Sequence, residues 1–481
     1  MAGFCFAKTN FVCIICTMVN NFGKKVFIGG IGGISTSGIA LFLISKGHIV
    51  VGSDPDEENE QVKLLKKLGV VVYHEQTAEI IKREKPDTYI FSYAIKEDCP
   101  ERYMASKICK QVLGRGKALG LLAQNFGKVV AVSGSHGKTT TTSILSYIFS
   151  QAGIEPTVHI GGVAKNFDKN FVIGDSDVFI TEACEYHNSF LNLFPFVSVI
   201  LNVQNDHMDF FKTAENLNNA FFNFATNTLK NGFVCLNKDD PILRDFERRL
   251  AKEYSVKTFS LLDTSADAYA KNIHIDRCTS AICFDAVVFG ESILDIKLNM
   301  VGRHNVYNAL VGLMVAKLFN IDTALIKNAL FTFSGIKRRY EIYGKINGAT
   351  IIHDYAHHPT EIETVIKETR LHFGKKVVAV FEPHTYSRTK SLWKGFVKSL
   401  AVADRVILCP IYPAREKPIK GVTSYILSLS IKNYNKNSEY VKNYAELAER
   451  LASSVTDDSV VLILGAGTIV RFLDGGKIFD S

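Results

Sequence analysis

The sequence predicts an α/β protein of three domains, each built around a parallel sheet. Short apolar runs of strand length recur along the chain, and most of them end directly in glycine or in polar residues. This pattern is typical of doubly wound sheets, whose ligands bind at the carboxyl ends of the strands. The length of 481 residues allows about three domains. We expect an extension at 1–20, a Rossmann-like N-terminal domain at 21–123, a central P-loop ATPase-like domain at 124–335 and a Rossmann-like C-terminal domain at 336–481.

Composition and charge argue against several classes of protein. The chain has 47% apolar and 22% charged residues, as soluble globular proteins do, and no segment has the roughly 18 consecutive apolar residues of a membrane span. Its net charge of +8 includes no block of basic residues, which favours phosphorylated small molecules over nucleic acid as partners. The ten scattered cysteines are typical of reduced cytosolic thiols. Residues 1–20 lack the basic start of a signal peptide, so we expect a poorly ordered extension.

The N-terminal domain opens with a βαβ pattern. It comprises a strand at 24–28, glycines at 29, 30, 32 and 33, a helix through Ser45 and a strand at 48–51 that precedes Gly52-Ser53-Asp54. Glycines let the backbone approach a diphosphate, and the acid can hold a ribose or a base. A tight strand–helix turn without a ligand explains the same glycines, and Ser35 stands where a third glycine is expected. A second loop, Ser92–Ile95, follows another strand at 88–91.

The stretch KVVAVSGSHGKTTTTSILSYIFS, at 128–150, combines a strand, a short loop and a helix. Unpaired N–H groups and the helix dipole make the start of such a helix a binding site for phosphate. Lys138 adds a charge for the β- and γ-phosphates, and the Thr139 hydroxyl can hold Mg²⁺. The loop is shorter than in common P-loops, and a glycine turn followed by a solvated lysine is the plain alternative. Because strand, loop, Gly-Lys-Thr and helix coincide, the stretch predicts ATP binding.

Acidic and imidazole groups follow two further apolar runs. The run 177–181 precedes Glu182, and 197–201 precedes Asn202, Asp206, His207 and Asp209. Beside a phosphate loop, such ligands predict a Mg²⁺ site. The alternative interpretation is that Glu182 is a solvated acid in a loop and that His207 is a hydrogen-bonded structural residue.

Amide and basic groups follow nearer the end of the central domain. Asn305 and Asn308 share one face of a helix, and their carboxamides could contact a base edge, whereas helix capping by Asn305 is the alternative. A basic run at 337–339 stands at the expected domain junction, where it could clamp a phosphate or form a solvated turn.

In the last third, four apolar runs each end in polar residues, which predicts another doubly wound sheet with its site at one edge. The runs lie at 350–352, 377–381, 405–408 and 460–464, and they precede HDYAHHPTE, EPHTYSRT, PIYPARE and GAG. Residues 427–442 are rich in Ser, Asn and Lys, and we expect a surface excursion there.

Taken together, the motifs resemble those of the Mur ligases. GSHGKTTTTS, Glu182 with DHMD, GRHNVYNAL, FSGIKRRYE, HDYAHHPTE, FEPHTYSRT, YPAREKP and LGAG occur in the same order. The resemblance implies a cytosolic step of peptidoglycan synthesis, in which ATP hydrolysis drives amide formation between UDP-N-acetylmuramate and L-alanine with Mg²⁺. It implies that the first domain binds UDP rather than NAD. PHTYSRT and YPAREKP fit the alanine-adding members better than the murein peptide ligases, and we expect a monomer or weak dimer.

The resemblance also implies roles for individual residues. ATP contacts fall to Gly134, Ser135, His136, Gly137, Lys138, Thr139, Thr140, Asn305, Asn308, Arg339 and Asp354, and magnesium is held by Thr139, Glu182 and His207. Contacts to the UDP-sugar or L-alanine fall to Gly30, Gly32, Gly33, Ser37, Asp54, Ser92, Ala94, His384 and Arg388. Catalytic roles fall to Lys138, His207, His357 and Arg388. Of these, His357 faces the γ-phosphate once the third domain closes.

The chain departs from the family pattern at two places. After Glu182 it has Ala-Cys-Glu-Tyr-His at 183–187, where many members have Ala-Asp-Glu-Ser-Asp, so neighbours that could touch the muramyl group differ. Ser35 adds a side chain to the first loop. Two other classes remain open from the residues: a nucleotide-binding regulator that uses ATP as a switch, and a nicotinamide-dependent oxidoreductase fused to an ATPase.

Overall fold

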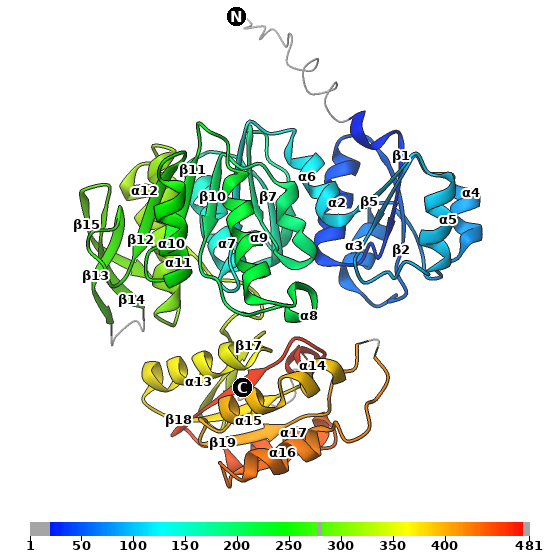
Figure 1. The fold of residues 1–481 in the computed structure, drawn as a ribbon. Coiled ribbons are helices and arrows are strands. Elements are labelled where there is room, and N and C mark those ends of the chain that lie inside the picture. Colours follow the sequence, from blue (N-terminus) through cyan, green and yellow to red (C-terminus); the bar gives the residue numbers. More distant parts are fainter. Residues whose placement is uncertain (1–19, 277–280, 415, 475–481) are drawn as a thin grey trace, which may run out of the picture. The chain divides into compact units, whose positions relative to one another are not determined.

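Three sheets flanked by helices confirm the predicted α/β class in the computed structural model, which describes residues 20–276, 281–414 and 416–474 (Figure 1). The chain divides into two units, and each is described by itself. The first contains the chain to Lys271 with Asp285–Leu294 and Tyr307–Leu330, and the second contains Asn272–Phe284, Asp295–Val306 and the chain from Phe331 onward. Among the described residues, no helix combines the length and apolar character that crossing a membrane requires. The extension predicted at 1–20 lies outside the described residues except for Asn20, which begins η1 (Asn20–Phe22).

The N-terminal sheet has five parallel strands in the order β3-β2-β1-β4-β5. Its strands are β1 (Lys25–Gly29), β2 (Ile49–Ser53), β3 (Val71–Tyr73), β4 (Thr88–Phe91) and β5 (Gln111–Gly114), and its helices are α2 (Ile34–Ser45), α3 (Glu60–Lys67), α4 (Ala78–Glu84), α5 (Pro100–Ile108) and α6 (Arg115–Ala123). Side chains alternate along β1, as the strand period requires. Val26 and Ile28 join the core with residues of α2, α3 and α6, whereas Phe27 joins the core with residues of α4 and α5.

The central sheet has the strand order β15-β14-β13-β12-β11-β10-β6-β9-β7-β8. Its strands are β6 (Lys128–Ser133), β7 (Thr157–Ala164), β8 (Lys169–Val172), β9 (Val178–Glu182), β10 (Val197–Ile200), β11 (Phe233–Asn237), β12 (Ser255–Ser260), β13 (Ala268–Ile275), β14 (Ile282–Val288) and β15 (Glu291–Leu298). The helices are α7 (Lys138–Gln151), η2 (Tyr186–Asn192), α8 (Met208–Phe211), α9 (Ala214–Thr226), α10 (Pro241–Leu250), α11 (His304–Leu318) and α12 (Thr323–Thr332). Because β6 pairs in parallel with both β9 and β10, the carboxyl ends of these three strands meet at one edge.

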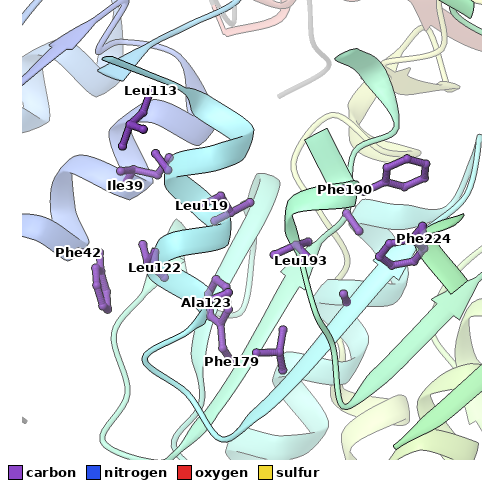
Figure 2. Packing of buried hydrophobic residues seen from close by; sticks show 14 of the residues in the cluster. Ile39, Phe42, Leu113, Leu119, Leu122, Ala123, Phe179, Phe190, Leu193 and Phe224 are labelled. Carbon is purple, nitrogen blue, oxygen red and sulfur yellow. The ribbon is translucent and has the colours of Figure 1, made fainter. Parts of the chain in front are cut away.

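Helix α6 joins the first two sheets through one hydrophobic core (Figure 2). Its Leu119 and Leu122 belong to the same cluster as Phe42 of α2 and Phe179 of β9. Phe126, just after the helix, packs against both α2 and β9, with its ring centroid 6.0 Å from that of Phe42 and 5.1 Å from that of Phe179. The N-terminal and central sheets are therefore held together by continuous apolar packing.

The C-terminal sheet has the order β16-β17-β21-β18-β19-β20 and is parallel except for the pairing of β16 with β17. Its strands are β16 (Glu341–Ile346), β17 (Ala349–Asp354), β18 (Lys376–Phe381), β19 (Arg405–Leu408), β20 (Ser438–Tyr440) and β21 (Ser459–Leu464). Its helices are α13 (Pro359–Phe373), α14 (Tyr386–Ser391), α15 (Trp393–Leu400), α16 (Ser424–Lys432), α17 (Tyr444–Ser454) and α18 (Ile469–Asp474). One face packs with residues of α13, α15 and α16, and the other with residues of α17 and α18.

The predicted surface excursion at 427–442 is wrong. Helix α16 and the edge strand β20 occupy most of this segment. Leu427 and Ile431 lie four residues apart on one side of the helix, and both are buried in the core. The Ser, Asn and Lys residues suggested a loop, but a helix with one buried face needs only a narrow apolar stripe.

We expect the shared core to make a large contribution to stability. Leu122→Ala should lower the free energy of unfolding by about 2–5 kcal/mol, because it leaves a cavity in a well-packed core. Leu122 is fully buried, whereas Leu68, a matched leucine of the same domain, is 54% exposed. Chemical denaturation of both leucine-to-alanine variants tests this. Similar losses at the two positions would show that the α6 core is not a main source of stability.

Candidate active site

Two glycines shape the loop between β6 and α7. Gly134 has a φ angle of +141° and Gly137 one of +87°, which side-chain-bearing residues adopt rarely. A Cβ at Gly134 would lie 3.0 Å from the Leu201 Cβ, and one at Gly137 would lie 2.9 Å from the Asn308 Oδ1. Glycine therefore lets this loop lie close to the end of β10 and to α11.

Hydrogen bonds tie the loop to the residues that follow β10. The Ser135 N–H donates to the Asn202 carbonyl (3.1 Å), and the His136 N–H donates to the Asn202 Oδ1 (2.9 Å). The Asn202 Nδ2 donates to the His136 carbonyl (3.1 Å). The Ser135 hydroxyl donates to the Gln204 carbonyl (3.0 Å) and accepts from the Gln204 N–H (2.8 Å). Two N–H groups of the predicted phosphate loop are thus bonded within the protein.

The start of α7 leaves further N–H groups for an anion. Its first intrahelical bond runs from the Thr141 N–H to the Gly137 carbonyl (2.9 Å), so the N–H groups of Lys138, Thr139 and Thr140 precede the helix's own hydrogen bonds. Thr139 is half-buried, and Thr140 is 9% exposed. This arrangement can hold phosphate oxygens at the positive end of the helix dipole.

Lys138 forms a buried ion pair with Glu185. Its Nζ lies 3.1 Å from the Glu185 Oε1 and 3.0 Å from the Oε2, and it also donates to the Gly134 carbonyl at 2.5 Å. Only 15% of the Lys138 side chain and 1% of the Glu185 side chain are exposed. Burial by itself lowers the pKa of Lys138, but the neighbouring Glu185 carboxylate raises that pKa overall. The lysine is therefore a fixed positive charge beside the loop.

Glu185, Asp206 and His207 form a cluster of metal-binding groups next to this ion pair. One ligand atom from each lies within 4.8 Å of the others. The His207 Nε2 is 3.7 Å from both the Glu185 Oε1 and the Asp206 Oδ2. Two carboxylates and one imidazole are a suitable donor set for a divalent cation. Sequence reasoning did not single out Glu185, although an acid three residues beyond the end of β9 was a usable signal.

Glu182, the last residue of β9, forms a hydrogen bond with the neighbouring strand β7. Its Oε1 accepts a hydrogen bond from the Gly161 N–H of β7 at 2.5 Å. Among the acidic and histidine side chains, His207 groups with Glu185 and Asp206, and Glu182 is not part of this cluster.

The two predicted asparagines of α11 differ in their contacts. Asn308 accepts a hydrogen bond from the buried Thr141 hydroxyl at 3.0 Å and lies beside Gly137. In the second unit, the Asn305 Nδ2 donates to the Val301 carbonyl at 2.6 Å. Asn308 is therefore at the phosphate loop, whereas Asn305 ties down the segment before its own helix.

The predicted nucleotide-binding residues of the first domain meet at the carboxyl ends of β1, β2 and β4. Gly30 has a φ angle of +70°, and a Cβ there would lie 2.9 Å from the Ser92 Cβ. The Gly32 N–H donates to the Asp54 Oδ2 (3.0 Å), and the Asp56 N–H donates to the Oδ1 (3.1 Å). The Asp54 carboxylate thus helps to shape the loop.

The remaining predicted residues of this domain bond locally. The Gly33 N–H donates to the Gly30 carbonyl (3.2 Å), and the Ala94 N–H donates to the Ser92 Oγ (3.4 Å). The Ser37 hydroxyl donates to the Ile34 carbonyl at 2.9 Å.

Ser35, which departs from the glycine fingerprint, binds the central domain. Its Oγ lies 2.9 Å from the Nε2 of His159 on β7, and the His159 Nδ1 lies 3.1 Å from the Thr181 Oγ1. Burial lowers the pKa of His159 to about 3, and the charge of Arg115 lowers it further. A neutral, buried imidazole therefore connects the first loop to the central sheet.

In the second unit, Asp354 is buried at the end of β17. Its Oδ2 accepts from the Tyr340 N–H and its Oδ1 from the Ala356 N–H, both at 2.8 Å. Burial raises the pKa of Asp354 to about 6, although the charge of Arg339 opposes this shift. The Arg339 guanidinium lies 5.2 Å from the centroid of the Tyr355 ring.

His357, His384 and Arg388 gather at the ends of β17 and β18. The ring centroids of the two histidines are 6.3 Å apart. The His357 Nδ1 is 3.1 Å from the Tyr355 carbonyl and 3.7 Å from the Glu361 Oε2. Burial and then the Arg388 charge lower the pKa of His384 to about 4, and burial is the main cause that lowers the pKa of His357. The structure thus brings together three predicted residues of the C-terminal domain.

Comparisons with known families match nearly the whole chain. Residues 26–127 match the Mur ligase family, catalytic domain; residues 132–316 match the Mur ligase middle domain; and residues 338–467 match the Mur ligase, glutamate ligase domain.

Individual proteins show the same likeness. The UDP-N-acetylmuramate–L-alanine ligase of Caldicellulosiruptor saccharolyticus is 42% identical over 94% of this chain and 98% of its own length. The enzyme of that name from Caldanaerobacter subterraneus subsp. tengcongensis is 38% identical, with the same two coverages. The crystal structure of UDP-N-acetylmuramate-alanine ligase from Thermotoga maritima has a TM-score of 0.78 and 26% identity, over 94% of this chain and 97% of that one.

The buried imidazole of His159 makes a testable contribution to pH dependence. Its folded pKa of about 3 lies below the ordinary 6.5, so the unfolded chain binds more protons between these values. The contribution of the neutral His159 imidazole to the free energy of unfolding is present above pH 6.5 and is lost as the pH falls toward 3. His159→Gln should therefore make the free energy of unfolding depend less steeply on pH between about 7 and 5. Urea unfolding across this range tests the prediction, with His274→Gln, at an exposed position of β13, as a control. An unchanged slope would contradict it.

Proposed function

Because the chain belongs to the Mur ligase family, we propose that it joins L-alanine to the lactyl carboxylate of UDP-N-acetylmuramate with hydrolysis of ATP, a step of peptidoglycan precursor synthesis. The observation that carries this proposal is the near full-length likeness to relatives that all bear the name of that activity. The Lys138–Glu185 pair beside His207, at the edge where three parallel strands end, supports it with a suitable site.

The reaction needs an activated carboxylate, because a free carboxylate is a poor electrophile. Transfer of the γ-phosphoryl group of ATP to the lactyl carboxylate forms an acyl phosphate. The amine of L-alanine then attacks its carbonyl carbon, and phosphate leaves as the amide forms. Phosphoryl transfer proceeds through a loose transition state whose charge lies on the phosphate oxygens, so catalysis is mainly positioning and charge stabilisation.

We propose that the β6–α7 loop holds the ATP phosphates. Lys138 supplies a positive charge that burial and Glu185 fix in place, and the N–H groups at the start of α7 supply donors. The loop residues Gly134–Gly137 surround these donors, while Asn305, Asn308, Arg339 and Asp354 contribute the remaining nucleotide contacts. Asn308 is already at the loop, through its bond to Thr141.

Mg²⁺ fits the donor set near Lys138 and, when bound, would neutralise charge on the phosphates. We propose that His207, Glu182 and Thr139 hold it, as the motif indicates, with the carboxylates of Glu185 and Asp206 as further candidates. The grouping of Glu185, Asp206 and His207 within 4.8 Å supports a cation site here.

The other two domains would bind the remaining substrates. We propose that Gly30, Gly32, Gly33, Ser37, Asp54, Ser92 and Ala94 contact the UDP-sugar, since these residues gather at one end of a parallel sheet. His384 and Arg388 would contact L-alanine or the sugar, and His357 would face the γ-phosphate.

The location, oligomeric state and domain bounds of the enzyme follow from its sequence in our proposal. We place it in the cytoplasm as a monomer or weak dimer, with small-molecule rather than nucleic-acid or membrane partners, and with domains at 21–123, 124–335 and 336–481. The modest charge of +8, without a basic block, supports small anionic ligands.

Phosphate release tests the function. The purified protein should release phosphate with ATP and Mg²⁺ only when UDP-N-acetylmuramate and L-alanine are both present. Activity with the recycled tripeptide instead of L-alanine would identify a murein peptide ligase. Absence of turnover with either amine would reject ligation.

Lys138→Ala should lower the turnover number at least about a hundredfold, because a fixed charge at the transferred phosphate is lost. Lys128→Ala is the matched control: this exposed lysine begins β6, at the end of the strand away from the phosphate loop. Because the first substitution leaves Glu185 without its ion-pair partner, circular dichroism should establish that the variant folds. Equal activity in both variants would remove Lys138 from the mechanism.

Glu182→Gln and Glu185→Gln should each raise the Mg²⁺ concentration for half-maximal rate about tenfold or more, because each removes a charged group from the proposed metal site. Glu215→Gln, in the first turn of α9, serves as the control. Rates measured across a series of Mg²⁺ concentrations show whether Glu182, Glu185 or both affect the Mg²⁺ requirement. If neither strand-end variant changes the requirement, the cation binds elsewhere.

A further inference from the structure

A chain of aromatic rings runs from the first domain's second loop to His207. The ring of Tyr93, which follows β4, stacks on that of His187, with centroids 4.3 Å apart and an interplanar angle of 15°. The His187 ring lies 4.3 Å from the Tyr186 ring. Tyr186 in turn stacks on His207, at 4.6 Å and 30°. Three contacts thus connect the proposed UDP-sugar loop to the proposed metal ligand, all within the first unit.

The surroundings fix these rings in place. The Phe210 ring of α8 packs against Tyr186 at 5.9 Å and against His187 at 4.9 Å. His187 and His207 both have left-handed backbones, with φ angles of 54° and 53°. Residues other than glycine adopt this conformation uncommonly, although histidine does so more often than most. The stack lies where the chain departs from the family pattern, at Tyr186 and His187.

We propose that Tyr186 is a positioning residue for His207. Its ring covers one face of the imidazole, so that the Nε2 edge stays turned toward Glu185 and Asp206, each 3.7 Å away. The tilted contact of Tyr186 with His187, and the stack of His187 on Tyr93, extend these ring contacts to the loop after β4. This inference rests on the proposed function for the role of His207, but the stack itself is a feature of this chain.

The physical reason is rotational freedom. An imidazole that must meet a cation loses affinity if its ring samples other orientations, and a stacked neighbour restricts those orientations. Stacked aromatic pairs contribute enough to change an equilibrium constant by about threefold to tenfold. Tyr186 needs only its ring face for this role, so phenylalanine should replace it and an aliphatic side chain should not.

The test measures Mn²⁺ binding to the full chain by electron paramagnetic resonance, in the presence of a non-hydrolysable ATP analogue. Tyr186→Leu should weaken Mn²⁺ binding about threefold to tenfold and lower kcat by a similar factor, with the KM for L-alanine unchanged. Tyr186→Phe should restore both. Phe222→Leu, which removes another ring of the central domain packed against Phe246, should change neither. Unchanged Mn²⁺ affinity in Tyr186→Leu would overturn the proposal, and Tyr186→Met replaces that variant if it does not fold.

A double-mutant cycle separates positioning from a direct role. If Tyr186 acts through His207, then Tyr186→Leu should cause no further loss of Mn²⁺ affinity once His207→Ala is present. A full additional loss would show that Tyr186 acts independently and would reject the proposal. The ligase function fails separately, if the unmodified protein binds Mn²⁺ but releases no phosphate with UDP-N-acetylmuramate and L-alanine.

Discussion

The buried ion pair between Lys138 and Glu185 is the interaction on which the candidate site depends. Two charges withdrawn from water are costly unless each has a close partner, and here the lysine also donates to a loop carbonyl. The pair joins the start of α7 to the segment after β9, so it fixes two strand ends relative to each other. Asn202, which follows β10, connects the end of this third strand to the loop through its hydrogen bonds to His136. The loop geometry is therefore set by the protein's own contacts.

Local signals in the sequence were sufficient for much of the fold. Strand β6, the loop and α7 follow from an apolar run, two glycines and a helical pattern that lie next to each other in the chain. The same holds for β4 and β19, whose bounds match the predicted runs. Lys138 and His207 could be named because each stands directly after such a run or loop, where a parallel sheet exposes side chains to ligands.

Contacts between distant segments could not be predicted in this way. Whether Glu182, at the end of β9, or Glu185 pairs with Lys138 depends on the backbone path between β9 and η2, and periodicity does not encode that path. In the sequence Ser35 is only a departure from a glycine fingerprint, because its partner, His159 on β7, is far away along the chain. In residues 427–442 the polar composition indicates a loop, whereas the spacing of the apolar residues fits the helix that the structure has. Leu427 and Ile431, together with the small buried side chains of Ser424 and Ser428, are enough to anchor this helix.

The continuous packing around α6 bears on how this protein can be divided. Phe126 packs against Phe42 of α2 and Phe179 of β9, and the apolar side chains of α6 share one core with residues of both sheets. A fragment cut after Ala123 would keep the helix but expose a face that normally contacts Phe179 and its neighbours, and exposed apolar surface of this kind promotes aggregation. A fragment for separate expression should therefore end beyond Leu330, where the first unit ends. It should not end at the boundary between the first two domains.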